Sequence, residues 1–574
     1  MSTTTAPAII RGRHLPNVWD IAALIAVVGA LIAVANAVQG TFVPLQSVEA
    51  GGLTLDPWRL PEYALRTTLR MFAALVASLI FTFTYAPLAA KSRRLGLIMI
   101  PILDVLQSVP ILGFLTFTTA FFMSLFPGHV IGLELASIFA IFTSQAWNMA
   151  FSFYQALTTI PGELDEAARG FRLTAWQRFW RLEAPFGVPG LVWNTMLSMS
   201  GGWFFVVASE AITLGEKSWT LPGIGSYVAL ALRKSDISAV FEAIAAMLVV
   251  IIAYDQLLFR PLVAWSAKFR FETTAGATAN DPWVLALLRR TRVLRAISGA
   301  VGDILNGIGA MRLTLPIGGR AVRQQSSRIG DAIFFFVVAA VVVWAAWKVA
   351  QYVAGTLSWG DVGQAVLLGS FTLLRVIVLM ALAALIWVPV GVWLGLRPAW
   401  ARRVQPLAQF LAAFPANLLF PPFVLVIVAW HLSPDIWLTP LMVLGTQWYI
   451  LFNVIAGAAA FPGDLREAAD NFRVGGSMWW RRVMLPGILP YFVTGAITAS
   501  GGSWNASIVA EVASWGDTHL AAHGLGAYIA QATDAGNFER VVLGVVVMSL
   551  YVLATNRLVW RPLYAYASRR TTLG

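Results

Sequence analysis

Long apolar stretches alternate with short polar segments along almost the whole chain. Most of them reach or exceed the roughly 20 residues that an α-helix needs to cross a hydrocarbon core of about 30 Å. They fall near residues 21–38, 68–90, 97–125, 130–157, 188–212, 238–258, 331–354, 367–396, 405–431, 437–460, 487–512 and 539–558. The pattern predicts an all-α polytopic membrane protein with about 12 transmembrane helices.

Several of these stretches are longer than one straight span requires. Tilted, kinked or broken helices are therefore expected, and prolines inside the stretches mark where the breaks would fall. These prolines include Pro110, Pro415, Pro421 and Pro422.

The composition agrees with a chain that lies in lipid. Hydrophobic residues make up 58% of the 574 positions and charged residues 12%, whereas soluble domains carry about 25% charged residues. The sequence has no cysteine, which excludes disulfides, thiolate metal sites and cysteine nucleophiles.

The basic residues predict the orientation of the chain. A net charge of +12 is compatible with nucleic-acid binding, but the Lys and Arg residues sit in short runs beside apolar stretches, as in cytoplasmic membrane loops. We therefore expect no nucleic-acid partner. We expect a multi-pass protein of the bacterial inner membrane with both termini in the cytoplasm. The runs are Lys91 to Arg94, Arg397 to Arg403, the arginines between Arg260 and Arg328, and Arg561, Arg569 and Arg570.

The N-terminal stretch is expected to remain as the first membrane helix. Arg11, Arg13 and His14 precede the apolar run 21–38, which is too long for the hydrophobic region of a cleaved signal peptide.

One polar, Arg-rich segment is written twice. It reads PGELDEAARGFRLTAWQRFWRLEAPFGVP from Pro161 and PGDLREAADNFRVGGSMWWRRVMLPGILP from Pro462, an offset of 301 positions. At the same offset Trp203 matches Trp504 and Glu210 matches Glu511, and upstream, at an offset of 305, Arg70 matches Arg375 and Pro110 matches Pro415. The chain is therefore an internal duplication of nearly 300 residues.

Six predicted spans per half is an even number, so both halves enter the membrane with the same orientation. The repeats are then parallel and related by a pseudo-two-fold axis along the membrane normal. Both copies of the polar segment face one compartment, where a symmetric dimer of one soluble protein could hold both.

The repeated segment resembles the EAA loop of the permease subunits of bacterial ATP-binding-cassette importers. That loop has Glu-Ala-Ala followed, nineteen residues after the Glu, by a proline. The same spacing joins Glu166, Ala167 and Ala168 to Pro185, and Glu467, Ala468 and Ala469 to Pro486. The first copy closes less typically, as Leu182-Glu183-Ala184-Pro185. We expect both prolines to stop the short helix where the chain turns back into lipid.

One position departs from the family pattern. Where the family has glycine, six residues after the Glu, this chain has Arg172 and Arg473. Gly170 and Asn471 lie two residues earlier, and both residue types tolerate left-handed backbone. This predicts a turn shifted to those two positions.

The resemblance implies a type I importer fold, with two permeases fused head to tail, and it is greatest to the nitrate/sulfonate/taurine/bicarbonate branch. It implies a small, anionic solute moved by alternating access, a periplasmic solute-binding protein, and two copies of an ATPase subunit into which the loops dock. ATP and Mg would be bound by that partner, because this sequence lacks a GxxxxGK[ST] phosphate loop. We therefore expect no enzyme activity and no cofactor in this chain.

These observations divide the chain into five parts. Residues 1–62 hold the N-terminal tail, the first span and a periplasmic loop, and 63–270 form the first permease core, with its loop at 161–186. Residues 271–328 form a basic cytoplasmic linker, 329–366 the seventh span and a periplasmic loop, and 367–574 the second core, with its loop at 462–487. Within the linker, 283–311 resembles an amphipathic helix on the inner leaflet; a partly ordered tether is the alternative.

Six residues are candidates for the translocation path: Arg70, Trp203, Glu210, Arg375, Trp504 and Glu511. For each there is a structural alternative, which we favour: ion pairing for the glutamates, packing for the tryptophans, and snorkelling for the arginines. His519 and His523, near Asp517, have helical spacing for a metal pair, but the first half has no counterpart, so no metal site is predicted.

Other functional classes remain open from the sequence alone. An ion-coupled secondary transporter also uses parallel repeats, and fused iron(III) permeases also carry two such loops. A receptor or scaffold that transports nothing is a further alternative.

Overall fold

The structure is a computed structural model that describes residues 52–269 and 291–571, apart from residues 109, 215–216, 313–327 and 517. Residues 283–284 and a few single residues between 21 and 45 are also described. The predicted first span at 21–38 and most of the linker at 271–328 lie outside the described residues.

The first half is a series of helices interrupted by one β-hairpin. Its elements are η1 (Pro57–Arg59), α3 (Leu60–Lys91), α4 (Arg93–Ser108), η2 (Ile111–Phe114), α5 (Leu115–Leu125), α6 (Ile131–Thr158), α7 (Gly162–Gly170), α8 (Ala175–Arg178), η3 (Phe179–Glu183), α9 (Ala184–Ser209), β1 (Ala211–Leu214), β2 (Lys217–Thr220), α10 (Ile224–Arg233), α11 (Ile237–Tyr254), η4 (Asp255–Phe259), α12 (Arg260–Ser266) and η5 (Ala267–Phe269). The linker contributes α14 (Arg292–Ala310).

The second half follows the same order. Its elements are α15 (Arg328–Ala354), α16 (Trp359–Gly395), α17 (Pro398–Ala413), η6 (Ala416–Leu419), α18 (Phe420–Ala429), α19 (Pro434–Trp437), η7 (Thr439–Met442), α20 (Gln447–Ala459), α21 (Gly463–Asn471), α22 (Gly476–Trp479), η8 (Trp480–Met484), α23 (Leu485–Ala510), β3 (Val512–Trp515), β4 (Thr518–Ala521), α24 (Leu525–Asp534), α25 (Phe538–Thr555), η9 (Asn556–Trp560) and α26 (Arg561–Thr571).

The predicted all-α polytopic membrane fold is confirmed. Among the described residues, seven helices are long and apolar enough to span a membrane, or nine if each of two bent pairs counts as one span. The pair at 406–413 and 416–429 bends by 80°, on either side of Pro415. The predicted stretch 97–125 is likewise broken at Pro110, between α4 and η2. The stretch 130–157 is α6, one continuous helix.

The broken helix of each half packs against a helix of the other half. At η2 of the first half, the backbone N–H of Ile111 donates to Asn505 Oδ1 on α23 at 2.7 Å. At the matching η6 of the second half, Asn417 Nδ2 donates to the carbonyl of Phe204 on α9 at 3.2 Å. These reciprocal bonds join the two bundles around a shared axis.

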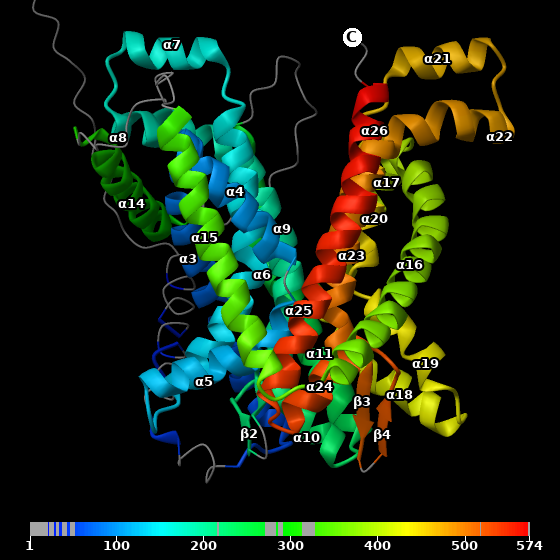
Figure 1. Ribbon diagram of the computed structural model, residues 1–574. Coiled ribbons are helices and arrows are strands. Elements are labelled where there is room, and N and C mark those ends of the chain that lie inside the picture. Colours follow the sequence, from blue (N-terminus) through cyan, green and yellow to red (C-terminus); the bar gives the residue numbers. More distant parts are fainter. Residues whose placement is uncertain are drawn as a thin grey trace, which may run out of the picture.

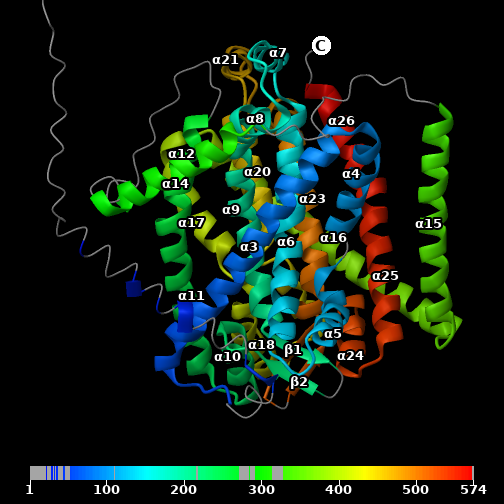
Figure 2. The ribbon, with the colours of Figure 1, turned by 90° about the vertical axis from the view of Figure 1, so that its left-hand side faces the viewer.

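One end of the molecule carries the short helices of the repeated loops, and the other end carries the β-hairpins. α7 and α21, with α8 and α22, project from the same end, near which the C-terminal helix α26 also lies (Figure 1). α7 and α21 lie on opposite sides of that end (Figure 1), and in the view at 90° one lies behind the other (Figure 2). The hairpins β1–β2 and β3–β4, which the sequence did not predict, lie at the opposite end (Figure 1). This arrangement agrees with parallel repeats.

Candidate functional site

The two repeated loops form short helices with exposed glutamates. α7 and α21 each follow a proline, and acidic residues in their first turns suit the positive end of the helix dipole. Glu166 and Glu467 are exposed, whereas Ala168 and Ala469 are buried. Each short helix therefore turns one alanine inward and its glutamate outward.

Both helices end in the same left-handed turn, and it is at Arg172 and Arg473. Their φ angles are 50° and 53°. After α7, the N–H of Arg172 donates to Arg169 at 2.9 Å and that of Leu173 to Ala168 at 3.2 Å, which is a Schellman motif. The expected shift of the turn to Gly170 and Asn471 is therefore wrong. Those residues end the helices.

Pro185 and Pro486 do not stop a helix, which corrects a second expectation. The chain runs as one helix from Ala175 to Ser209 and from Gly476 to Ala510. Just before each proline the helix widens by a π-helical turn, η3 or η8. In the wider turn, the N–H of Ala184 bonds to the carbonyl of Phe179, so the ladder adjusts where proline offers no N–H.

Each loop carries an exposed phenylalanine that was not predicted as a site residue. Phe171 and Phe472 are 80% and 83% exposed, directly before the left-handed turns. Their signal was present, because two phenylalanines 301 positions apart stand in otherwise polar loops. An exposed aromatic side chain on a loop that also carries an exposed glutamate is typical of a residue that anchors a protein interface.

The first loop is braced more firmly than the second. Arg178 pairs with Asp165 at 2.6 Å and with Glu183 at 3.1 Å, and Lys91 pairs with Glu183 at 2.8 Å. Glu183, which made the first copy less typical, is thus the centre of an ionic brace. The second half has Leu396, Arg466, Trp479 and Met484 at the matching positions.

The linker helix adds to this brace. Trp176 Nε1 on α8 donates to the carbonyl of Ile308 at 2.6 Å, and Gln177 Nε2 donates to that of Ala310 at 3.0 Å. These two carbonyls belong to the last turn of α14, where helix acceptors have few internal partners; that of Ile308 also accepts from the N–H of Met311 at 3.3 Å. A helix therefore forms within the predicted range 283–311, and its end is attached to the first loop.

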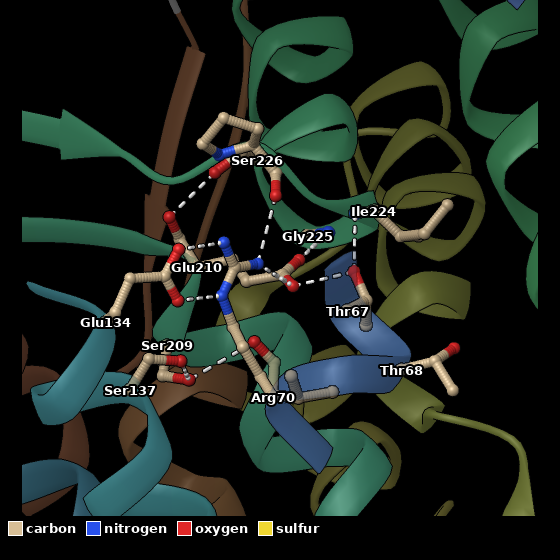
Figure 3. A network of polar contacts seen from close by, with 12 residues as sticks. Thr67, Thr68, Arg70, Glu134, Ser137, Ser209, Glu210, Ile224, Gly225 and Ser226 are labelled. Atoms are coloured by element: carbon tan, nitrogen blue, oxygen red, sulfur yellow. Dashed lines mark hydrogen bonds and ion pairs between the residues drawn. The ribbon is translucent and has the colours of Figure 1, made fainter. Parts of the chain in front are cut away.

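At the opposite end, Arg70 and Glu210 lie in a buried ionic cluster that also contains Glu134 (Figure 3). Arg70 on α3 donates to Glu134 at 2.6 and 2.7 Å and to Glu210 at 2.7 Å. Thr67 donates to Glu210 at 2.6 Å and accepts from the N–H of Ile224 at 3.0 Å. The cluster thus joins α3, α6, α9 and the start of α10.

The second half repeats this cluster in a looser form. Arg375 pairs with Glu511 at 3.1 Å and with Asp435 at 3.0 Å. Thr372 donates to Glu511 at 2.8 Å, as Thr67 does to Glu210. Asp435 is 42% exposed and also pairs with His523. His523 thus has a carboxylate partner, and Asp517 lies outside the described residues.

Burial raises the pKa of the Glu210 and Glu511 carboxyls, and the neighbouring arginine opposes the rise in each case. Glu134 and Asp435 were missed as partners. They were detectable as acidic residues 301 positions apart, at or near the start of apolar stretches.

The two predicted tryptophans pack inside the bundles. Trp203 and Trp504 are buried and contact Tyr254 at 5.6 Å and Tyr551 at 6.0 Å between ring centroids. Of the six candidates for the translocation path, Trp504 alone lines the central cavity between the halves, which is described next. Glu210 and Glu511 directly precede β1 and β3, whose hairpins lie at the end opposite α7 and α21 (Figure 1), so the loops and the ionic clusters form no common site.

A central cavity of about 200 Å³, open to solvent, lies between the two halves. Much of its wall consists of equivalent positions from both repeats, so it lies on the pseudo-two-fold axis. Its described lining includes hydroxyl, amide and aromatic groups but no Lys, Arg, Asp or Glu. The equivalent pairs are Gln107 and Ala412, Ile111 and Ala416, Ser144 and Gly445, Asn148 and Tyr449, Ser200 and Gly501, Gly201 and Gly502, Phe204 and Asn505, and Phe205 and Ala506.

Two parallel membrane bundles, a cavity on their axis and one protruding short helix from each half define a transport permease built from two equivalent parts. The chain belongs to the family described as the binding-protein-dependent transport system inner membrane component, whose model matches residues 82–259 and 387–570. The family resemblance stated above is therefore confirmed, and it covers both halves.

The curated relatives are permeases of single-repeat length. The chain is 30% identical over 188 residues to the bicarbonate transport system permease protein CmpB of Synechococcus elongatus, covering 33% of this chain and 64% of that protein. It is 26% identical over 188 residues to the nitrate import permease protein NrtB of Leptolyngbya laminosa, with coverage of 33% and 64%. It is 29% identical over 211 residues to the glycine betaine/carnitine transport permease protein GbuB of Listeria monocytogenes, with coverage of 35% and 66%. The chain thus spans just under two thirds of the length of the first of these.

Proposed function

We propose that this chain is the membrane permease of an ATP-driven importer in the bacterial inner membrane, in which one chain supplies both permease halves. A periplasmic solute-binding protein delivers a small anionic solute to the end that carries the β-hairpins. The opposite end, with the C-terminus, faces the cytoplasm. The names of two relatives, a bicarbonate and a nitrate permease, support the choice of an anion.

The observation that carries the proposal is the matched pair α7 and α21. They project from one end of the molecule, stop at the same left-handed turn and present the same exposed Phe and Glu. Two identical ATPase subunits would each hold one of these helices. ATP and Mg are bound by those subunits, and this chain converts their closure into motion of the two halves.

The central cavity is the proposed path of the solute. A wall of neutral hydrogen-bonding groups replaces part of a solute's hydration without holding it tightly, which suits passage rather than storage. The earlier candidates Arg70, Glu210, Arg375 and Glu511 belong to structural clusters in this proposal. Trp203 packs, and Trp504 packs while forming part of the cavity wall.

Reconstituted vesicles that hold the chain, an ATPase subunit and a binding protein test the proposal. Replacing both glutamates, Glu166→Ala with Glu467→Ala, should abolish uptake while ATP hydrolysis continues without stimulation by solute. Glu62→Gln, at the other end of the molecule, is the matched control and should transport normally. Unchanged uptake in the double variant would refute the coupling role. Uptake that needs no ATPase and collapses with the proton gradient would instead indicate a secondary transporter.

A further inference from the structure

The second half contains an apolar pocket that opens on its side. It lies between α16, α23 and the segment α25–η9, and we call it the lateral pocket. It encloses about 500 Å³, and its wall is almost entirely apolar. Residues that form it include Ile377, Met380, Ala384, Tyr551, Thr555 and Trp560.

The equivalent space in the first half is filled by larger side chains. The register is secure because Thr67 and Thr372 make the same contacts with Glu210 and Glu511. At the matching positions Phe72 becomes Ile377, Met199 becomes Ser500, and Tyr254 becomes Thr555.

In the first half these residues form one packed cluster. The ring of Tyr254 lies 5.8 Å from that of Phe72 and 5.6 Å from that of Trp203, and its hydroxyl contacts the sulfur of Met199. Phe72, Met199 and Tyr254 thus occupy the region that is hollow in the second half, where Ile377, Ser500 and Thr555 are smaller.

The second half keeps a tyrosine, but one helical turn earlier. Tyr551 stacks on Trp504 at 6.0 Å, and its hydroxyl donates to the carbonyl of Val366 on α16 at 2.9 Å. This bond helps hold α25 against α16 beside the pocket. The pocket is therefore framed by fixed side chains on helices that cannot simply collapse into it.

We propose that the lateral pocket binds an acyl chain of a membrane phospholipid. The α16 residues that line it, from Leu373 to Ala384, lie in the middle of the 37-residue helix Trp359–Gly395, so the pocket is at mid-depth of the bilayer. Lipid-facing residues at its edge are bare, with Ile377 53% and Leu558 77% exposed. At this depth the surrounding molecules are lipid tails.

Packing is the reason for binding. Lipid tails are as apolar as leucine, so no hydrophobic transfer favours the pocket over the bilayer. An empty pocket would instead deprive its lining of contacts on one side. A flexible acyl chain restores those contacts, as Tyr254 and Met199 do within the first half.

The bound chain would also complete the wall of the central cavity. Ser500, Thr555 and Trp560 line both the lateral pocket and the central cavity. The lipid therefore separates the cavity from the bilayer on this side, where the first half uses its own side chains.

The test uses the full chain in vesicles of phosphatidylethanolamine and phosphatidylglycerol that contain a trace of phospholipid with a photoreactive diazirine in mid-chain. After illumination, labelled peptides are mapped by mass spectrometry. We expect the peptides with Ile377 and Thr555 to be labelled several-fold more than the matching peptides with Phe72 and Tyr254. Equal labelling of the two halves would overturn the proposal.

Variants that copy the first half provide the second comparison. Ile377→Phe and Thr555→Tyr, made separately, should each lower labelling of the pocket several-fold. Leu385→Phe is the matched control, because Leu385 is 73% exposed on the same helix but lies outside the pocket; its labelling pattern should match the wild type. Thermal unfolding of each variant shows whether it folds, and one folded pocket variant is sufficient.

Two results would contradict the inference. One is wild-type labelling in a folded pocket variant. The other is displacement of the probe by bicarbonate or nitrate, which would assign the pocket to a transported solute rather than to lipid. Neither result would affect the proposed coupling through α7 and α21.

Discussion

The duplicated ionic clusters predict that two equivalent arginines differ in their importance for stability. Arg70 is 3% exposed, and its partners Glu134 and Glu210 are 7% and 0% exposed. Replacing Arg70 with Met leaves two buried carboxylates without a cation. Removing one member of a buried ion pair costs about 3–5 kcal/mol, so we expect Arg70→Met to destabilise the protein by about that amount.

The same change in the second half should cost less. Arg375 is 12% exposed and its partner Asp435 is 42% exposed, so water can solvate what the arginine leaves behind. The remaining loss is the charged hydrogen bond to buried Glu511, for which about 1–3 kcal/mol is typical. A third variant, Arg66→Met, breaks a pair at 3.1 Å with Glu62, which is 43% exposed and belongs to no buried cluster; it should cost about 0–1 kcal/mol.

Thermal and denaturant unfolding of the purified variants in one detergent would rank these three costs. A rescue variant makes the test sharper: Arg70→Met combined with Glu134→Gln and Glu210→Gln removes all three charges. Neutral replacement of a buried ion cluster is often tolerated, so this variant should recover most of the lost stability. The reasoning is refuted if Arg375→Met is the more damaging single change, or if the triple variant is no better than Arg70→Met.

Three further predictions concern the loops. Phe171→Ala and Phe472→Ala should each weaken binding of the ATPase subunit by more than about 1 kcal/mol, roughly fivefold, in a pull-down or titration; unchanged affinity would show that the rings lie outside the interface. Arg172→Gly and Arg473→Gly should each raise stability by about 1 kcal/mol, because glycine removes the steric cost of left-handed backbone, as measured by thermal unfolding; a loss of stability would mean that the arginine side chains contribute more than the turn costs. Glu183→Ala removes the carboxylate that joins Lys91 to Arg178, leaves Arg178 with Asp165 alone, and should speed proteolytic cleavage of the first loop relative to the second; equal cleavage rates before and after the change would argue against the ionic brace.

The positions of the loops and clusters could be predicted because the sequence is written twice. Every pairwise match at the 301 or 305 offset was readable, and the repeat identified Arg70, Glu210, Arg375 and Glu511 as a related set. Their partners could not be assigned in the same way. Glu134 reaches Arg70 only because α6 packs against α3, and that packing is not a property of either segment alone.

Local backbone geometry was predicted less well. Glycine is the commonest left-handed residue, so Gly170 was a reasonable choice for the turn, but the six-residue spacing from Glu166 placed it at Arg172. Proline usually ends a helix, yet Pro185 lies within one because a π-helical turn precedes it.

By itself the sequence determined that this is a membrane protein of two parallel repeats. The length and spacing of the apolar stretches are local properties, and the thickness of the bilayer sets the length that a spanning helix needs. It also located the two repeated loops, which are recognised by spacing along the chain. The exchange of broken helices between the halves, the central cavity and the lateral pocket were decided only by the tertiary structure. Each depends on which side chains from distant segments meet, and on where a large residue in one half is replaced by a small one in the other.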